Sequence, residues 1–242
     1  MGRDDIFKRE HEGRKQRMEA IRYERETEWL IVCEGEKTEP NYFNGLVEYF
    51  NQNSSSQVAI RAVGQGRNTT DLVEHLEDYF AFMDRLLGRS LIPYEKVILV
   101  FDKDSFSSEQ FNSAVYRAKK ENPGCIVAWS NESFELWLLL HYDYIDSALS
   151  RYDYNQKLTK LFREKGICDK TQSYEKNWKS NIKLFDAIIK SGGSVERAVA
   201  NAEKLIKDKD LSNPAKINPA TMVCEAVKAL ADEAGYLIKR GE

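Results

Sequence analysis

Two apolar, β-prone runs in this chain each end abruptly in carboxylates. The first occupies residues 29–36 and closes on Glu-Gly-Glu, and the second occupies residues 97–104 and closes on Asp-Lys-Asp. Continuous apolar runs of this kind are typical of parallel strands that are buried on both faces. Because open α/β sheets carry their chemistry at the carboxyl ends of such strands, the two motifs predict one acidic site at the edge of a parallel sheet.

Strand and helix patterns alternate through the first part of the chain. The strand patterns occur at about 28–34, 58–63, 96–101 and 125–129. Helix patterns lie between them: the first opens at Thr38, an expected N-cap, and a later one carries apolar residues at helical spacing over 72–83. This β-α-β-α order predicts an α/β fold with a mainly parallel sheet, flanking helices and crossover connections.

Beyond about residue 145 the strand signals stop, and apolar residues recur at helical spacing. We expect helices within 158–162, 178–189, 195–206 and 219–238. The beginning of the chain is instead dense in charge of both signs. We therefore divide the chain into a charged N-terminal segment (1–26), an α/β domain (27–146) and a C-terminal helical region (147–242). The helical region either forms a small domain of its own or packs on the first domain.

The composition indicates the cellular compartment but does not identify a ligand. The chain of 242 residues has a formal net charge of -3, which neither predicts nor excludes binding to nucleic acid. Its four cysteines are scattered without a Cys-x-x-Cys pair, so no zinc site is predicted and a reducing compartment is favoured. No stretch approaches the ~20 apolar residues that cross a bilayer, and the start of the chain lacks an apolar signal region. We expect a cytoplasmic protein that does not enter a membrane.

The acidic motifs are candidates for binding a divalent cation. Asp102 and Asp104 lie two residues apart just after a buried strand, where they can jointly hold one or two cations. Oxygen ligands favour a hard cation, most simply Mg²⁺, with Mn²⁺ as the alternative. Glu34, at the end of the other strand, can bind the metal directly or act as a general acid or base. The simpler interpretation of each motif is a solvated acid at a strand exit.

A third acidic element follows the fourth predicted strand. Glu135 lies within the apolar run 134–140, at the start of a predicted helix, and can complete a metal shell. Asn131 and Ser133 can cap that helix or donate hydrogen bonds to a phosphate. The alternative is an ordinary helix start, with a capping serine and a first-turn acid that the helix dipole favours.

Three basic residues are candidates for contact with a substrate phosphate. Lys37 and Lys103 stand beside the acidic motifs, where they either contact phosphate or moderate the local negative field. Arg67 lies in the glycine-containing loop 64–69, whose backbone can approach a phosphate. A plain strand-to-helix connection explains that loop equally well.

Four segments of the chain together resemble a known family. They are 32–43, 101–104, 133–141 and the Asn-Pro-x-Thr sequence at 218–221, and they are similar to the motifs of the RloB family. That family in turn resembles the Toprim domain of the OLD-type (overcoming-lysogenization-defect) nucleases. The resemblance extends from about Arg22 to the C-terminal helix.

The resemblance implies a Toprim-like fold and roles for individual residues. Glu34 would be the strand-one glutamate, and Asp102 with Asp104 would be the metal-binding pair. The Ser-x-Glu pattern that ends at Glu135 implies this residue as a second metal ligand. Glu39 is implied as a further metal ligand, at the acidic position that follows the first glutamate.

The resemblance further implies a catalytic lysine and a partner. A late lysine is expected near the metal, and Lys176 is the candidate for this position, with Lys157 as the alternative. RloB-like proteins resemble the second, AbiLii-like component of abortive-infection systems, which acts beside an ABC-type ATPase. The chain has no Gly-x-x-x-x-Gly-Lys-Ser/Thr motif, so any such ATPase would be a separate partner protein.

Hypotheses from different functional classes follow from these motifs. The first is a Mg²⁺-dependent, Toprim-type nuclease that hydrolyses phosphodiester bonds of DNA, tRNA or other RNA, as the effector of an antiphage abortive-infection system. The second is a non-catalytic binding module that docks on the ABC-type ATPase and uses its acids for a structural cation. A primase-like phosphoryl transfer on the same fold is a third. The sequence leaves the oligomeric state open, a homo-oligomer included.

Overall fold

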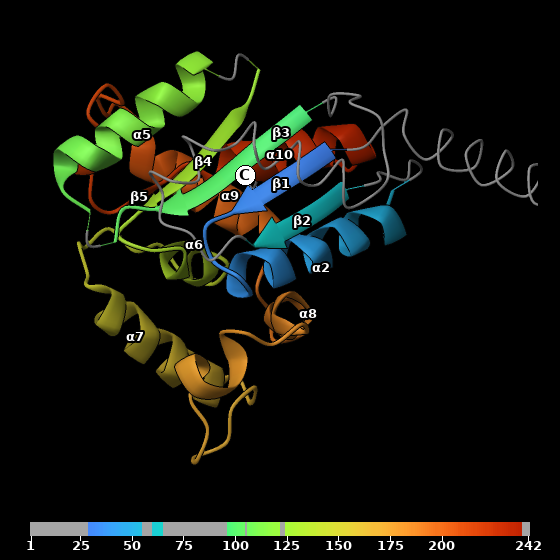
Figure 1. Ribbon diagram of the computed structural model, residues 1–242. Helices are drawn as coiled ribbons and strands as arrows, with labels where there is room; N and C mark the ends of the chain where they lie inside the picture. Colours follow the sequence, from blue (N-terminus) through green and yellow to red (C-terminus); the bar gives the residue numbers. More distant parts are fainter. Residues whose placement is uncertain (1–28, 55–59, 65–95, 105, 122–123, 239–242) are drawn as a thin grey trace, which may run out of the picture.

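A β-sheet runs through the middle of the molecule, with helices on both of its faces (Figure 1). The structure, a computed structural model, describes residues 29–54, 60–64, 96–104, 106–121 and 124–238. The charged segment 1–26 and the helix expected over 72–83 lie outside these ranges.

The sheet has the strand order β2-β1-β3-β4-β5. Its strands are β1 (Trp29–Cys33), β2 (Ile60–Gly64), β3 (Lys96–Asp102), β4 (Ile126–Asn131) and β5 (Ala220–Thr221). The first four run parallel, and β5 pairs antiparallel with β4. The predicted α/β fold with a mainly parallel sheet is therefore confirmed. Since β1 and β3 are direct neighbours, their carboxyl ends and the acids that follow them lie side by side.

The central strands are apolar because both faces of the sheet are covered. Every residue of β1 is buried, and alternate residues enter different hydrophobic clusters. Trp29, Ile31 and Cys33 belong to the larger cluster, which lies on one face. Leu30 and Val32 belong to the smaller cluster on the other face.

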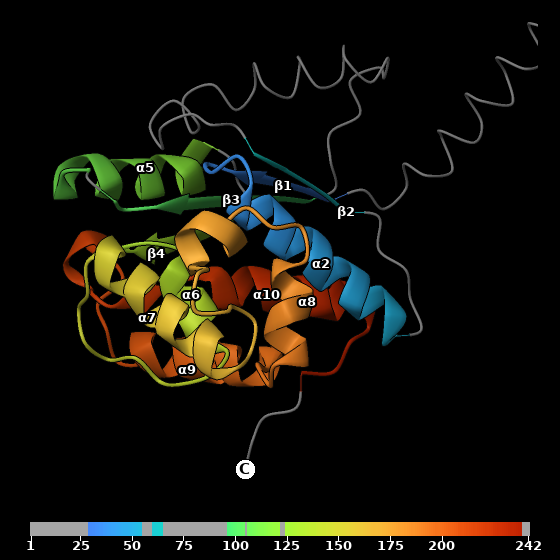
Figure 2. The same cartoon turned by 90° about the horizontal axis from the view of Figure 1, so that it is seen from below.

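The helices that the structure describes cover the two faces unequally. On one face, α5 (Ser108–Glu121) packs over the smaller cluster together with the 3₁₀ turn η2 (Pro214–Lys216). The opposite face carries α2 (Thr38–Gln52), α6 (Glu135–Leu140), α7 (Arg151–Glu164), the π-helical turn η1 (Tyr174–Trp178), α8 (Leu184–Lys190), α9 (Val195–Ile206) and α10 (Val223–Ala234). Figure 2 shows the difference with the sheet seen nearly edge-on. None of the described helices is long and apolar enough to cross a membrane.

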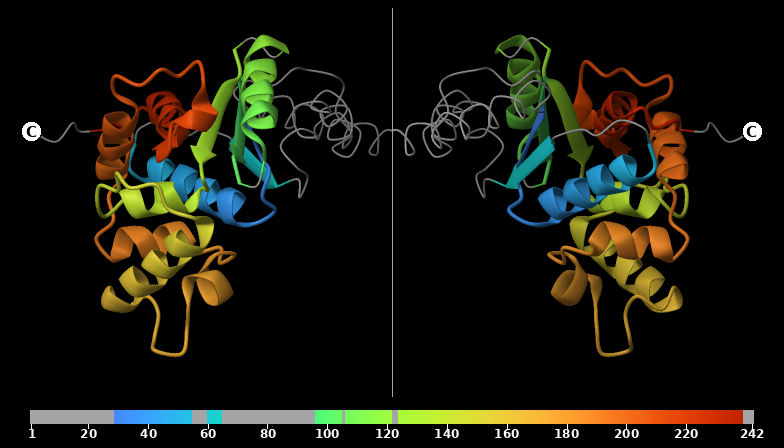
Figure 3. Two further views of the ribbon diagram at one scale, coloured as in Figure 1. Left: turned by 90° about the vertical axis from the view of Figure 1, so that its left-hand side faces the viewer. Right: turned by 90° about the vertical axis from the view of Figure 1, so that its right-hand side faces the viewer.

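The C-terminal helical region shares its core with the α/β part. Leu158 of α7, Phe185 of α8 and Val227 of α10 belong to the same buried cluster as Tyr42 of α2 and Trp137 of α6. Strand β5 also returns the chain from this region to the sheet. Figure 3 shows α7 beyond α6, at the end of the molecule away from α5. The division of the chain into domains stays a prediction.

Three local expectations differ from the structure. Lys37, rather than Thr38, is the N-cap of α2, and its side chain makes no capping hydrogen bond. The helix expected over 219–238 begins only at Val223, because the residues before it form the antiparallel strand β5. The helix expected over 178–189 is divided between two elements, η1 and α8, with a break between them.

Candidate active site

A pocket opens at the carboxyl ends of β1 and β3, where the sheet meets the helices. It has a volume of about 450 Å³. In the described part of the chain, six carboxylates line it: Glu34, Glu36, Glu39, Asp102, Asp104 and Glu135. Three basic side chains line it as well: Lys37, Arg151 and Lys179. The acids outnumber the bases, so the pocket carries an excess of negative charge that attracts cations.

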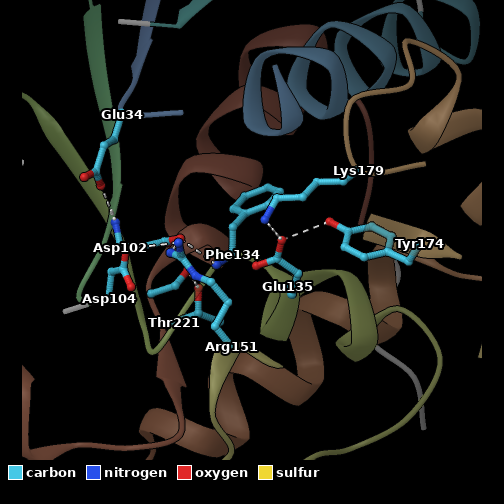
Figure 4. Close-up of polar contacts among 10 residues, drawn as sticks. Glu34, Asp102, Asp104, Phe134, Glu135, Arg151, Tyr174, Lys179 and Thr221 are labelled. Carbon is cyan, nitrogen blue, oxygen red and sulfur yellow. Dashed lines mark hydrogen bonds and ion pairs between the residues drawn. The ribbon is translucent and has the colours of Figure 1, made fainter. Parts of the chain in front are cut away.

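Glu34 links the ends of the two central strands. Its backbone N–H donates to the carbonyl of Val100 (2.9 Å), which extends the ladder between β1 and β3 by one residue. Its carboxylate accepts a hydrogen bond from the backbone N–H of Asp102 (3.1 Å). The two acidic motifs are thus in direct contact, as Figure 4 shows.

Glu39 lies against Gly35, on the first turn of α2. A Cβ atom at residue 35 would collide with the Glu39 carboxylate, so any larger residue there would displace it. Glu39 is buried, and this burial, followed by the negative charges of Glu135 and Glu34, raises its pKa to about 7. In the absence of a bound cation, the pocket therefore holds this carboxyl partly protonated at neutral pH.

Arg151 bridges the two aspartates of the second motif. Its Nη2 lies 3.2 Å from Oδ2 of Asp102, and its Nη1 lies 3.0 Å from Oδ2 of Asp104. The same Asp102 oxygen accepts the backbone N–H of Phe134 (3.0 Å). Burial, and then the charge of Glu39, raises the pKa of Asp102 well above its usual range in spite of the arginine.

The start of α7 places Arg151 at the pocket. Ser150 caps the helix through a reciprocal capping box with Asp153. Further along, Tyr154 and Leu158 face the larger hydrophobic cluster and anchor the helix. The backbone of Arg151 is therefore held in the first turn of an anchored helix, and its side chain extends from there to the aspartates.

Glu135 is almost completely buried, and a lysine pairs with it. The Lys179 Nζ lies 3.1 Å from Oε1 of Glu135, and the Tyr174 hydroxyl donates to the same oxygen (3.1 Å). Burial raises the pKa of Glu135, but the positive charges of Lys179 and Arg151 and the hydrogen bonds to its carboxylate together outweigh burial and lower the pKa. Glu135 therefore stays ionised at neutral pH. It opens α6, whose N-cap, Phe134, makes no side-chain hydrogen bond, so neither of the expected capping residues acts there.

Most of the site residues predicted from the sequence meet in this pocket. Those that line it are Glu34, Glu39, Asp102, Asp104, Glu135 and Lys37. They come from the ends of β1 and β3 and from the starts of α2 and α6. Metal binding and catalysis by these residues stay predictions.

The lysine at the pocket is not the one expected from the sequence. Lys176, within η1, and Lys157, on α7, are both exposed, and neither lines the pocket. Lys179 lines it instead. A π-helical turn is closed by an i→i+5 hydrogen bond, here from the N–H of Lys179 to the carbonyl of Tyr174 (2.7 Å). Residues five apart then lie on the same side of the turn, so the side chains of Tyr174 and Lys179 both reach Glu135.

Two other predicted phosphate contacts, Asn131 and Lys103, are not among the residues that line the pocket. Asn131 is buried, and its side-chain amide donates to three carbonyls within 214–217, so it anchors η2. The Lys103 ammonium donates to the carbonyl of Phe106 (3.3 Å). Arg67 lies outside the described residues, so the expectation for it stays a prediction.

Arg151 and Lys179 are the basic pocket residues that the sequence does not predict. Neither stands beside an acidic motif, and both belong to a region in which only helical periodicity is visible. One local signal exists for Arg151, because the Ser-x-x-Asp capping box that ends at Asp153 marks the start of its helix. No pattern signals Lys179, because its position depends on the turn η1.

The carboxylates do not form a closed metal cluster as they stand. Among the residues that the structure describes, no three His, Cys, Asp or Glu side chains are gathered closely enough to hold a metal ion. The positive charges of Arg151 and Lys179 compensate part of the acidity. The donor set still fits a hard divalent cation, because the acids present carboxylate oxygens and the pocket attracts positive charge.

Comparisons with known proteins address the family. The family model described as RloB-like protein matches residues 29–230. No curated protein and no solved structure matches the chain. The matched range covers more than half of the chain and contains every residue that lines the pocket. The chain therefore belongs to the RloB-like family.

Proposed function

We propose that this chain is a Mg²⁺- or Mn²⁺-dependent nuclease of the Toprim type, which hydrolyses phosphodiester bonds in DNA or RNA. The observation that carries the proposal is the convergence of Glu34, Asp102 and Asp104 at the ends of neighbouring parallel strands. Further acids and three basic side chains surround them. Such a pocket suits a reaction that brings a metal ion and a phosphate together.

The carboxylates divide into two groups by their place in the fold. Glu34, Asp102 and Asp104 lie at strand ends and would hold a first divalent cation. Glu39 and Glu135 lie on helices and would complete its shell or hold a second cation. The pKa of about 7 at Glu39 supports this view, because it reflects buried negative charge that a cation would compensate. When bound, the cation supplies Lewis-acid stabilisation of a phosphate oxygen and lowers the pKa of a water.

The basic side chains would bind the substrate. Arg151 and Lys179 come from the helical region, and Lys37 comes from the turn before α2. Charge-assisted hydrogen bonds from these groups can hold the non-bridging oxygens of a phosphodiester. Glu34 would then orient the attacking water or accept its proton, if it is not needed as a metal ligand.

The wider role is proposed from membership of the RloB-like family. The chain would be the effector of an antiphage abortive-infection system and would act in the cytoplasm. An ABC-type ATPase, supplied by a partner protein, would control when the pocket meets nucleic acid. Family membership supports this role, whereas the phosphodiester substrate is argued from the pocket.

Conservative substitutions of the strand-end acids test the nuclease. Glu34→Gln and Asp102→Asn keep the side-chain size and remove a charge, so each should lower Mg²⁺-dependent cleavage at least about 100-fold. Asp186→Asn changes an aspartate of α8 with 54% of its side chain exposed, and should retain full activity as the matched control. Cleavage of DNA and of tRNA is measured with the ATPase present, and circular dichroism checks folding. Full activity of either folded site variant would show that these residues are not the site.

A second candidate function is a non-catalytic module that docks on the ATPase. One observation favours it: Asp102, Asp104 and Glu135 are already ion-paired with Arg151 and Lys179, as they would be in a structural cluster. Titration of the chain with Mn²⁺, beside the cleavage assay, separates the two functions. Metal binding without cleavage of DNA or tRNA, even with the ATPase present, would favour the module.

A further inference from the structure

One guanidinium joins the two aspartates of the acidic pocket. Arg151 uses separate nitrogens for them, Nη2 for Asp102 (3.2 Å) and Nη1 for Asp104 (3.0 Å). Figure 4 shows the side chain reaching from α7 to these two carboxylates. Its third nitrogen, Nε, is buried and has no hydrogen-bond partner among the described residues. Arg151 is therefore an internal counter-ion for the second acidic motif.

The arginine can move more easily than the carboxylate that it holds. The Asp102 side chain is 8% exposed, and its Oδ2 also accepts the backbone N–H of Phe134 (3.0 Å). The backbone N–H of Asp102 is in turn bonded to Glu34. By contrast, the Arg151 side chain is 36% exposed and sits on a flexible stem. When another cation arrives at Asp102, the guanidinium is the group that can leave.

A divalent cation and the Arg151 guanidinium compete for the same oxygens. Both are attracted to Oδ2 of Asp102 and Oδ2 of Asp104, and two cations at one carboxylate repel each other strongly in a partly buried site. The guanidinium cannot lose its proton to relieve that repulsion. A cation at these oxygens therefore disfavours the Arg151 contacts, and Arg151 in turn weakens the binding of the cation.

The released guanidinium has the right chemistry for a phosphate. Arginine presents N–H donors in a planar fork that fits two phosphate oxygens as well as it fits carboxylates. A phosphodiester that binds the cation would lie next to the oxygens that Arg151 has left, within reach of the same side chain. A nucleic acid thus supplies a new partner for Arg151 and removes its competition with the metal.

We propose that Arg151 is a substrate-binding residue that exchanges Asp102 and Asp104 for a substrate phosphate when a divalent cation binds. The inference rests on the proposed metal-dependent nuclease function. The exchange makes metal and nucleic acid bind cooperatively. When the metal binds alone, Arg151 loses its partners, whereas a bound nucleic acid gives it a new one. The pocket is then fully assembled only when both are present.

Substitution of Arg151 should strengthen the binding of metal alone. In a calorimetric titration of the full chain with Mn²⁺, without nucleic acid, Arg151→Gln should bind about 5- to 100-fold more tightly than the wild type. Arg163→Gln changes an exposed arginine of the same helix, whose guanidinium donates to the carbonyl of Gln172, and should leave the affinity unchanged. Arg151→Lys keeps the charge without the fork and should bind Mn²⁺ with an affinity between those of the wild type and Arg151→Gln.

The cooperative binding of metal and nucleic acid provides a second readout. The affinity for a fluorescent phosphorothioate oligonucleotide, which resists cleavage, is measured by anisotropy with and without Mn²⁺. Mn²⁺ should tighten this binding more in the wild type than in Arg151→Gln, because only the wild type releases a guanidinium to the phosphate. An equal gain in both proteins would overturn the inference.

The outcomes also separate this inference from the proposed function. If the wild type binds Mn²⁺ and Arg151→Gln binds it no more tightly, the exchange is wrong and the metal site stands. If neither folded protein binds Mn²⁺, the proposed metal-dependent function fails together with the inference. Should Arg151→Gln not fold, the same comparison is made with Arg151→Lys, and equal Mn²⁺ affinity in that variant and the wild type overturns the exchange.

Discussion

Glu39 links the chemistry of the pocket to the stability of the chain through a single proton. Its pKa is raised from 4.5 to about 7, first by burial and then by the neighbouring carboxylates. Between these two pH values the folded chain keeps a proton that the unfolded chain has lost. The stabilising contribution of this proton is complete below pH 4.5 and is lost as the pH rises through about 7.

Glu39→Gln should weaken this pH dependence. In the wild type without divalent cations, the loss of the Glu39 proton should lower the free energy of unfolding by about 3 kcal/mol as the pH rises from about 4.5 to about 7.5. The fall should be smaller in Glu39→Gln, and should not vanish, because the raised pKa of Asp102 acts in the same direction. Urea denaturation at several pH values in EDTA measures both proteins.

The control for this experiment lies on the same helix. Glu48 is on the exposed side of α2, so Glu48→Gln should keep the pH dependence of the wild type. If Glu39→Gln also keeps the full pH dependence of the free energy of unfolding, the proton responsible for it belongs to another group.

Among the individual residues, the acids of the pocket could be predicted from the sequence, whereas its basic side chains Arg151 and Lys179 could not. Glu34, Asp102 and Asp104 follow buried strands, and neighbouring parallel strands bring such ends together whatever the rest of the fold does. Arg151 and Lys179 reach the pocket only through the packing of α7 and η1 on the other elements. Nothing in the residues around them indicates that packing.

Among the elements, the π-helical turn η1 determines which lysine reaches the pocket. Lys179→Gln should lower cleavage about 100-fold, because the variant loses a cation at the reacting phosphate and leaves the buried Glu135 without its ion pair. Lys176→Gln, three residues earlier and exposed, should cleave at the wild-type rate. The initial rates of the two variants are compared under identical conditions. Equal rates in the two would remove Lys179 from the site.

Length decides which elements the sequence reveals. The apolar stripe over 195–206 is long enough to predict α9, which has those bounds. Strand β5 has two residues, too few for any alternation, and is recognised only by its pairing with β4, next to the hydrogen bond from Met222 N–H to the carbonyl of Trp129 (2.7 Å). The helix expected over 178–189 is too long: its second half is confirmed as α8, whereas Trp178 belongs to the π-helical turn η1, and the apolar spacing does not show the break between them.

In the molecule as a whole, the pocket lies where the sheet and the helical region meet. Strand ends and the helices that follow them supply the acids, and the chain beyond residue 146 supplies Arg151 and Lys179. One hydrophobic cluster joins both parts behind the pocket. The family match over 29–230 likewise spans both. In the described chain the helical region is therefore part of the site and supplies the side chains proposed to bind phosphate.

Anomalous diffraction from crystals grown with Mn²⁺ shows whether this pocket binds a divalent cation, as the proposed phosphodiester hydrolysis requires. We predict an anomalous peak bounded by the carboxylates of Glu34, Asp102 and Asp104, with Glu135 within reach. We also predict that the Arg151 guanidinium has moved away from the aspartates. An ordered pocket without a peak, in which Arg151 still bridges Asp102 and Asp104, would contradict a metal site in this pocket.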